Sequence, residues 1–303
     1  MNKRWFDLLN LHQPRLECPQ GLDQQGARRF LKTVRIDGGP VAELEGYVDR
    51  DWRRFLFTWM LCRSLEGRCL EIGAAPYFTT ALLSEFSSLD LTLSNYSPSD
   101  ETSGEHGVRW VSPNNGSEMH HTMRHDLFNV ENDCLPYPDN HFDVVLFCEV
   151  LEHLTNDPFR ALGEIRRVIK PGGRLILTTP NVACAKNVLK MFKGGNVNDR
   201  YSAYGPYGRH NREFTAAEVR LVLAIMEFSV ERLFTANVLF RRMSQLIANF
   251  AAVLAFTAFS RSRARALGQY ILVSAVKGEA SEAKRPEWLF RSYADPDQTF
   301  ELR

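Results

Sequence analysis

The 303-residue sequence contains no Cys-x-x-Cys pair. Its six cysteines are scattered along the chain, and most of their neighbours are apolar. This pattern argues against a disulfide framework or a cysteine zinc site, and it favours buried free thiols in a reducing compartment. The cysteines are Cys18, Cys62, Cys69, Cys134, Cys148 and Cys184.

The sequence also has little net charge. The 37 Lys and Arg residues nearly balance 36 Asp and Glu residues, for a formal charge of +1. Composition therefore gives no electrostatic reason to expect nucleic acid as the main partner. The first residues, Met1–Trp5, lack the long apolar run of a signal peptide, so we expect a cytoplasmic protein.

A chain of this length, with 44% apolar and 24% charged residues, is able to bury one large core. Residues 1–40 are polar and are expected to form an N-terminal extension. The main domain is expected over residues 41–276, with an apolar helical insertion at 241–265. Residues 277–303 form a charged C-terminal tail.

Within the insertion, Met243–Ser260 carries no charge and is flanked by arginines on both sides. Polar residues such as Gln245 and Asn249 dilute this stretch, and the symmetric basic flanks specify no orientation, which disfavours a membrane span. Two alternatives stay open. One is a buried helix pair that forms the core or a homodimer contact. The other is an interfacial helix over 243–260 that holds the protein at the inner face of a membrane.

From residue 41 the apolar pattern alternates between helical and strand periods, which is typical of an α/β domain. Thr215 begins a helix with a capping box, because Glu218 follows three residues later. Other helices are expected at Val41–Leu65, Phe78–Phe86 and Asp157–Ile169, and strands at Cys69–Ile72, Leu89–Ser94, Phe142–Cys148, Arg174–Thr179, Ser229–Phe234 and Tyr270–Val276.

The turn after the first of these strands is a candidate ligand site. Glu71 and Gly73 lie where the strand gives way to a helix, and a glycine there lets the backbone approach a ligand closely. In open α/β sheets, ligands bind at the carboxyl ends of such strands. Only one glycine stands at the turn, so by itself the segment fits a simple strand–helix turn equally well.

Six short segments in residues 67–180 occur together in an order and spacing that resemble the class I S-adenosylmethionine-dependent methyltransferases. They are Leu70–Gly73, His125–Leu127, Leu135–Asp139, Phe142–Val145, Glu149–His153 and Ile169–Gly173. The resemblance implies a Rossmann-like, doubly wound, mostly parallel seven-stranded sheet with helices on both faces and an antiparallel last strand. It also implies S-adenosylmethionine as the cofactor.

The same resemblance assigns cofactor contacts by position. Glu71 and Gly73 would face the methionine part, Asp126 the adenine amino group, and Leu127 the adenine ring. Asn95 stands where the family usually has an acid for the ribose hydroxyls, and an amide can still form hydrogen bonds to a diol. Two further residues complete the candidate cofactor set, Ala74 and Cys148.

Glu149, Glu152 and His153 have spacings that would place them on one face of a helical turn. Two carboxylates beside an imidazole suit a divalent cation, Mg²⁺ or Mn²⁺. With His210 downstream, the set resembles that of small-RNA 2′-O-methyltransferases and of catechol-methylating enzymes of the ubiquinone pathway, which implies these four residues as metal ligands. The alternative is that the string only borders the substrate pocket and that His210 covers it. Without a metal, His153 or His210 is the candidate general base, and Glu149 completes the catalytic set.

The loop Lys193–Arg212 is rich in Gly, Tyr, Asn and Arg, which suits the faces and hydroxyls of a sugar. Residues 201–214 resemble bacterial methyltransferases associated with surface-polysaccharide and glycolipid assembly. We therefore expect an O-methyltransferase acting on a hydroxyl of a glycan or glycolipid intermediate. The alternatives are a methyltransferase of catechols, quinone precursors or secondary metabolites, and an inactive binding module that kept the fold.

Overall fold

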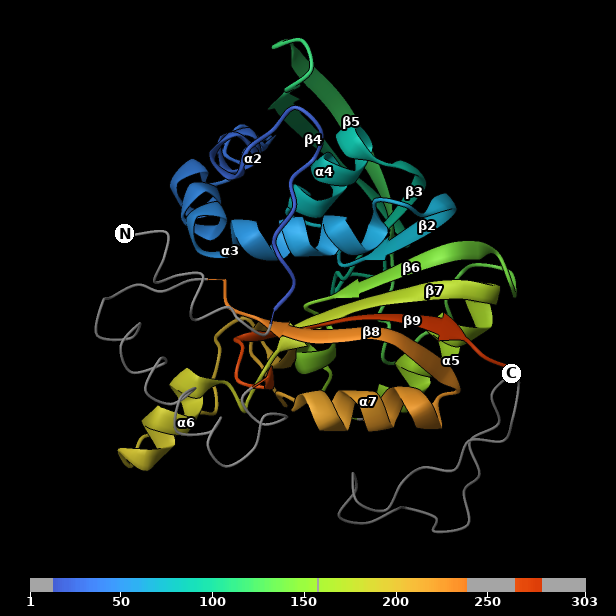
Figure 1. Ribbon diagram of the computed structural model, residues 1–303. Helices are drawn as coiled ribbons and strands as arrows, with labels where there is room; N and C mark the ends of the chain where they lie inside the picture. The colour runs from blue at the N-terminus through green and yellow to red at the C-terminus, as the bar shows by residue number, and fades with distance from the viewer. Residues whose placement is uncertain (1–12, 157, 239–264, 280–303) are drawn as a thin grey trace.

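The computed structural model describes residues 13–156, 158–238 and 265–279. Its centre is a nine-stranded sheet with the strand order β1-β4-β5-β3-β2-β6-β7-β9-β8 (Figure 1). The strands are β1 (Arg35–Ile36), β2 (Glu66–Ile72), β3 (Ser88–Asn95), β4 (Ser103–Val111), β5 (Glu118–Leu127), β6 (Phe142–Cys148), β7 (Ile169–Pro180), β8 (Phe228–Ala236) and β9 (Tyr270–Lys277). The helices are α2 (Gln24–Leu31), α3 (Val41–Cys62), α4 (Phe78–Phe86), α5 (Pro158–Val168), α6 (Ala185–Phe192) and α7 (Ala216–Ile225), with 3₁₀ turns η1 (Leu151–His153) and η2 (Pro206–Gly208).

The central strands are parallel, and the last one is not. β5, β3, β2, β6 and β7 pair in parallel, whereas β9 pairs antiparallel with both β7 and β8. The predicted doubly wound α/β class with an antiparallel last strand is confirmed. The sheet has two strands more than the expected seven, because a β4–β5 hairpin and the short β1 extend the β5 edge.

Helices cover both faces of the sheet, as predicted (Figure 1). On one face, α2, α3 and α4 pack around Phe57, Trp59 and Phe78, all buried. On the other, α5 and α7 enclose Phe159, Leu162 and further apolar side chains. Because parallel strands buried on both faces need apolar side chains in both directions, β2 and β6 are nearly continuous apolar runs in their buried halves.

The predicted N-terminal extension contributes to the domain over its described part, residues 13–40. Ala27, Phe30 and Leu31 of α2 belong to the same buried cluster as α3. β1 adds to the sheet through pairing of Arg35 with Arg109 of β4. The apolar stretch Met243–Ser260 lies outside the described residues, and among those that are described no helix combines the length and apolarity needed to cross a membrane.

Candidate functional site

The cofactor turn is built by the ends of β2 and β3 together. Gly73 adopts φ +73°, a left-handed conformation that glycine reaches without a steric penalty. The Gly73 and Ala74 amides donate to Ser94 O, at 2.8 and 3.0 Å. The Asn95 amide oxygen accepts from the Ala75 amide at 2.9 Å. The second strand therefore holds the turn of the first one in place.

Asn95 has a second role in the same turn. Its side-chain nitrogen donates to the Tyr77 hydroxyl at 3.1 Å, and Tyr77 is itself fully buried at the start of α4. The predicted ribose contact is thus engaged in shaping the turn, although Asn95 still borders the adjacent pocket. An asparagine can fill this role where an acid could not, because it both accepts and donates.

Glu71 points away from the pocket. It is 5% exposed, and its carboxyl group accepts from the Thr80 hydroxyl of α4 at 2.6 Å. Burial raises the pKa of Glu71 to about 7, against the lowering effect of that hydrogen bond. Its direct structural role is therefore to join β2 to α4.

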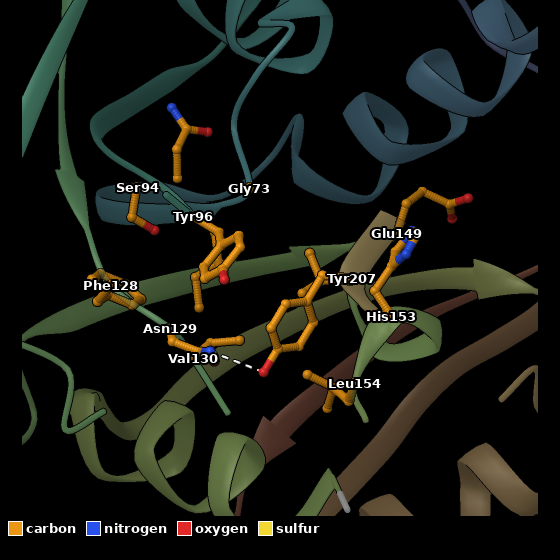
Figure 2. A pocket seen from close by; sticks show the side chains of 13 residues that line it. Gly73, Ser94, Tyr96, Phe128, Asn129, Val130, Glu149, His153, Leu154 and Tyr207 are labelled. Atoms are coloured by element: carbon orange, nitrogen blue, oxygen red, sulfur yellow. Dashed lines mark hydrogen bonds between the residues drawn. The ribbon is translucent and has the colours of Figure 1, made fainter. Parts of the chain in front are cut away.

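A pocket of about 180 Å³ opens next to Gly73, at the carboxyl ends of β2 and β3 (Figure 2). Such concave, mainly apolar sites are typical of purine-containing cofactors. Glu149 and His153 stand at one end of it. The remaining lining residues are Ile72, Gly73, Ser94, Asn95, Tyr96, Phe128, Asn129, Val130, Val150, Leu154 and Tyr207.

Several predicted cofactor residues do not line this pocket. Asp126 accepts a 2.5 Å hydrogen bond from the Tyr137 hydroxyl, and the Leu127 amide donates to Thr102 O. The residues that reach the pocket from this strand end are instead Phe128 and Asn129. Glu71, Ala74 and Cys148 also lie outside the lining. Strand β5 continues to Leu127, so the chain turns into the crevice only after it.

Glu149 stands apart from its expected partners. It has φ +58°, which is uncommon for a residue with a side chain, and it precedes the turn η1 rather than sharing a helical face with Glu152. Its carboxylate accepts from Thr178 Oγ1 at 2.9 Å and lies 3.8 Å from Arg54 Nε. Burial raises the pKa of Glu149, and the charge of Arg54 opposes the rise. The expected common face for Glu149, Glu152 and His153 is therefore absent.

The other three candidate ligands do converge. One ligand atom from each of Glu152, His153 and His210 lies within 4.8 Å of the other two. The rings of His153 and His210 meet edge to face, with centroids 5.0 Å apart. Glu152 is fully buried, and its Oε2 accepts from Thr179 Oγ1 at 2.9 Å, while its Oε1 has no hydrogen-bond partner.

Both histidines are oriented by a hydrogen bond at Nδ1. His153 Nδ1 lies 2.9 Å from Arg209 O, which can only accept, so Nδ1 carries the proton. The unprotonated Nε2 lies 3.9 Å from Glu152 Oε1. His210 Nδ1 lies 2.9 Å from Glu213 Oε1. This second layer of carbonyl and carboxylate partners is the arrangement that metal-binding histidines usually have.

The three groups differ in ionisation. Burial and the neighbouring Glu149 raise the pKa of Glu152 to about 8. Burial and the charge of His210 lower the pKa of His153. Burial also acts to lower the pKa of His210, but the hydrogen bond to Glu213 and the charge of Glu152 outweigh it and bring this pKa to about 9. At neutral pH, His153 is therefore the neutral imidazole of the pair.

A second, more polar pocket of about 470 Å³ begins at His210. Charged and amide side chains dominate its walls, and Tyr270 contributes a hydroxyl that donates to Asp51 at 2.9 Å. His153 borders the first pocket and His210 the second, so the histidine pair stands between the two. The polar wall consists of Arg50, Asp51, Asn181, Lys186, Asn187, Glu213 and Gln269.

The strand order and the crevice above Gly73 define the class of protein: a Rossmann-like α/β domain with its ligand site at the carboxyl ends of parallel strands. Residues 71–177 match the family model described as "Methyltransferase domain". This match supports the predicted S-adenosylmethionine-dependent methyltransferase domain of class I, and with it the predicted cofactor.

Curated relatives match over short stretches of the chain. A ubiquinone/menaquinone biosynthesis C-methyltransferase, UbiE, from Shewanella frigidimarina is 38% identical over 63 residues, which are 20% of this chain and 25% of that protein. A "Probable S-adenosylmethionine-dependent methyltransferase" from Mycolicibacterium smegmatis is 36% identical over 97 residues, 32% of each chain. The chain thus spans about a quarter to a third of the length of these relatives.

Among solved structures, a SAM-dependent methyltransferase from Archaeoglobus fulgidus aligns over 84% of this chain and 96% of its own, with 14% identity and a TM-score of 0.43. An S-adenosylmethionine-dependent methyltransferase from Mesorhizobium loti aligns over 75% and 98%, with 13% identity and a TM-score of 0.41.

Proposed function

We propose that the protein is an S-adenosylmethionine-dependent O-methyltransferase that acts on a hydroxyl of a sugar, glycan or glycolipid intermediate. The observation that carries this proposal is the position of the histidine pair between two unlike pockets. The apolar pocket at Gly73 suits the cofactor, and the polar pocket at His210 suits a hydroxyl-rich acceptor. A methyl group would pass from one to the other past His153 and His210.

The residues present fit a divalent cation at Glu152, His153 and His210. Glu152 Oε1 is fully buried and has no hydrogen-bond partner, and each histidine has its Nδ1 engaged in a hydrogen bond. Together they form a set of two histidines and one carboxylate. Two nitrogen donors favour Mn²⁺ over Mg²⁺ between the two ions that the sequence suggested. A bound cation would lower the pKa of an acceptor hydroxyl and orient its oxygen.

If no cation takes part, His153 is the better general base of the two histidines. Its Nε2 carries no proton, because Nδ1 donates to Arg209 O, and its lowered pKa keeps the imidazole neutral at neutral pH. The pKa of His210 is raised to about 9, so His210 is protonated there. In that reaction the acceptor oxygen bonds to the methyl carbon as the carbon–sulfur bond breaks. The hydroxyl proton moves to His153 Nε2, and S-adenosylhomocysteine leaves.

The decisive experiment is calorimetry with S-adenosylmethionine, followed by a methyl-transfer screen over sugar nucleotides and glycolipids. Binding with transfer to a sugar hydroxyl supports the proposal. Transfer only to catechols or quinone precursors supports the small-molecule alternative, to which the likeness to a C-methyltransferase adds weight. A chain that binds no cofactor would support the inactive binding module.

The metal is tested on the same protein by Mn²⁺ calorimetry. Glu152→Gln and His210→Ala should each weaken Mn²⁺ binding at least tenfold, because each removes one of three ligand atoms. Glu164→Gln is the matched control, since its carboxylate is paired with Arg167 and is not one of the three converging groups. Equal Mn²⁺ affinity in the wild type and Glu152→Gln would remove the metal from the proposal.

Peripheral membrane contact through residues 243–260 and a homodimer remain proposals from the sequence. Vesicle co-sedimentation and sedimentation velocity of the full chain test them separately. If the acceptor is a glycolipid, the vesicle experiment is the more relevant of the two, because the enzyme would then work at the membrane surface.

A further inference from the structure

Tyr207 occupies the mouth of the pocket assigned to the cofactor. It comes from η2, in the loop between α6 and α7, and its ring meets the ring of Tyr96 edge to face with centroids 4.9 Å apart. Figure 2 shows the two rings side by side in the pocket, with Tyr96 close to Gly73 and Tyr207 above Leu154. A residue far along the chain thus closes the crevice formed by β2 and β3.

The Tyr207 hydroxyl is held by groups from the opposite wall. It accepts from Asn129 Nδ2 at 2.9 Å, drawn as the dashed line in Figure 2, and more weakly from Asn132 Nδ2 at 3.4 Å. It donates to Glu131 Oε2 at 2.8 Å. Glu131 is 2% exposed and is itself fixed by Thr155. The position of the Tyr207 ring is therefore fixed by the buried Glu131.

With Tyr207 in this position, the pocket is narrower than the sites that usually enclose small molecules. Its volume is about 180 Å³, whereas small-molecule pockets usually enclose about 300 Å³ or more. Tyr207 narrows the pocket from a loop, and in that loop it is flanked by two glycines, Gly205 and Gly208. Gly205 adopts φ +79° with open space around it, and Gly208 ends η2.

The same loop reaches the second site. His210 lies three residues after Tyr207, and between them Arg209 O binds His153 Nδ1. The Asn211 amide donates to Glu152 O at 2.7 Å. Movement of Tyr207 out of the crevice would therefore also disturb the position of His210 beside His153.

We propose that Tyr207 gates the cofactor pocket: its ring must leave the crevice before the cofactor enters. The loop then closes over the bound cofactor with the ring outside the crevice, and this closure returns His210 to its place beside His153. The inference rests on the proposed function, because it takes the Gly73 pocket as the cofactor site. It implies that the cofactor binds before the acceptor.

The test measures association of S-adenosylhomocysteine with the tethered full chain by surface plasmon resonance. Tyr207→Phe removes the three hydrogen bonds and keeps the ring, and Tyr207→Ala also empties the crevice. We expect association at least fivefold faster for Tyr207→Phe and at least tenfold faster for Tyr207→Ala. Tyr204→Ala is the matched control, because Tyr204 belongs to the same loop but is 91% exposed.

Unchanged association rates in both Tyr207 variants, with normal binding, would overturn the gate and leave the proposed function standing. Slower association in Tyr207→Ala would also overturn it, since Tyr207 would then help to capture the ligand. Absence of binding in the wild type and every variant would overturn both proposals. Near-ultraviolet circular dichroism of each variant confirms that the fold is intact.

Discussion

Carboxyl groups of this protein differ in ionisation because their partners differ. Asp143 is partly exposed and contacts Lys170 at 2.7 Å, and despite some burial its pKa is lowered by that hydrogen bond and by the Arg68 amide. Glu71 has only a hydroxyl partner, and Glu152 has a hydroxyl and a second acid nearby, so burial dominates and raises both pKa values. Deep burial is thus what sets Glu71 and Glu152 apart.

The raised pKa of Glu71 predicts a pH-dependent stability. The unfolded chain ionises Glu71 near 4.5 and the folded chain near 7, so the stabilising effect of the neutral buried form is present below 4.5 and is lost as pH rises to 7. Glu71→Gln should remove this loss. As the pH rises from 4.5 to 8, the free energy of unfolding of Glu71→Gln should increase by up to about 3 kcal/mol relative to that of the wild type.

Urea denaturation of the cofactor-free protein at several pH values measures this difference. Glu66→Gln, at the exposed start of the same strand, is the control. A stability difference between wild type and Glu71→Gln that is constant across pH would show that Glu71 ionises normally.

Gly73 is expected to be required for cofactor binding. A Cβ atom at this position would lie 3.1 Å from Val150 Cγ2, inside the pocket lining, and φ +73° would strain any L-residue. Gly73→Ala should lower the free energy of unfolding by about 1–2 kcal/mol and weaken S-adenosylmethionine binding at least tenfold.

Gly116→Ala separates the two effects. Gly116 has φ +72° but open space around it, in the turn between β4 and β5. It should lose similar stability and keep full affinity in the same calorimetry. Equal affinity in both variants would place the cofactor elsewhere.

At the scale of elements, the start of α7 depends on Thr215. The Thr215 hydroxyl accepts from the Glu218 amide at 3.2 Å, and the Glu218 carboxylate accepts from the Thr215 amide at 2.8 Å, so the predicted capping box is confirmed. Thr215→Ala should cost about 1 kcal/mol of stability, and Thr215→Ser should retain most of it.

The midpoint of urea unfolding at constant slope measures this cost. Because the cap directly follows the loop with His210, Thr215→Ala should also widen the spread of His210 ring positions. Identical midpoints for the Ala and Ser variants would contradict a contribution of the hydroxyl cap to stability.

Sequence patterns predicted the elements with apolar periodicity far better than the sheet edge. β2, β6 and β9 are predicted within two or three residues, because burial on both faces leaves an apolar run. The β4–β5 hairpin was missed, since most of its outward residues are polar and only a few, such as Trp110 and Met123, are buried. The Asn115-Gly116 pair, a strong hairpin signal, was available in the sequence.

At the scale of the whole molecule, cofactor binding should stabilise the fold. The pocket is formed by residues from the ends of β2 and β3, from the segments that follow β5 and β6, and from η2, and these are adjacent only in the folded chain. At 100 times its dissociation constant, S-adenosylhomocysteine should add about 2.7 kcal/mol to the free energy of unfolding. This corresponds to a rise of roughly 5 °C in Tm.

Differential scanning fluorimetry of the wild type measures the rise, and Gly73→Ala should reduce it strongly. An equal rise with adenosine alone would show that the methionine part contributes nothing. No rise at saturating ligand would contradict the assignment of the pocket.

The resemblance to known methyltransferases implied the parallel centre of the sheet and the approach of Glu152, His153 and His210 to one site. The sequence by itself determined the α/β class and the turn at Gly73. These features follow from local periodicity and from short motifs with fixed spacing, and both can be recognised without knowledge of distant contacts. Residues that are close together in the sequence are sufficient to determine these features.

Only the tertiary structure decided which of the candidate side chains face the pockets. Glu149 turns to Arg54, Asp126 binds Tyr137, and Asn95 binds the cofactor turn, because each finds a partner from another element. Tyr207 enters the crevice from more than a hundred residues away. Side-chain direction depends on which strands and loops become neighbours, and one-dimensional spacing does not contain that information.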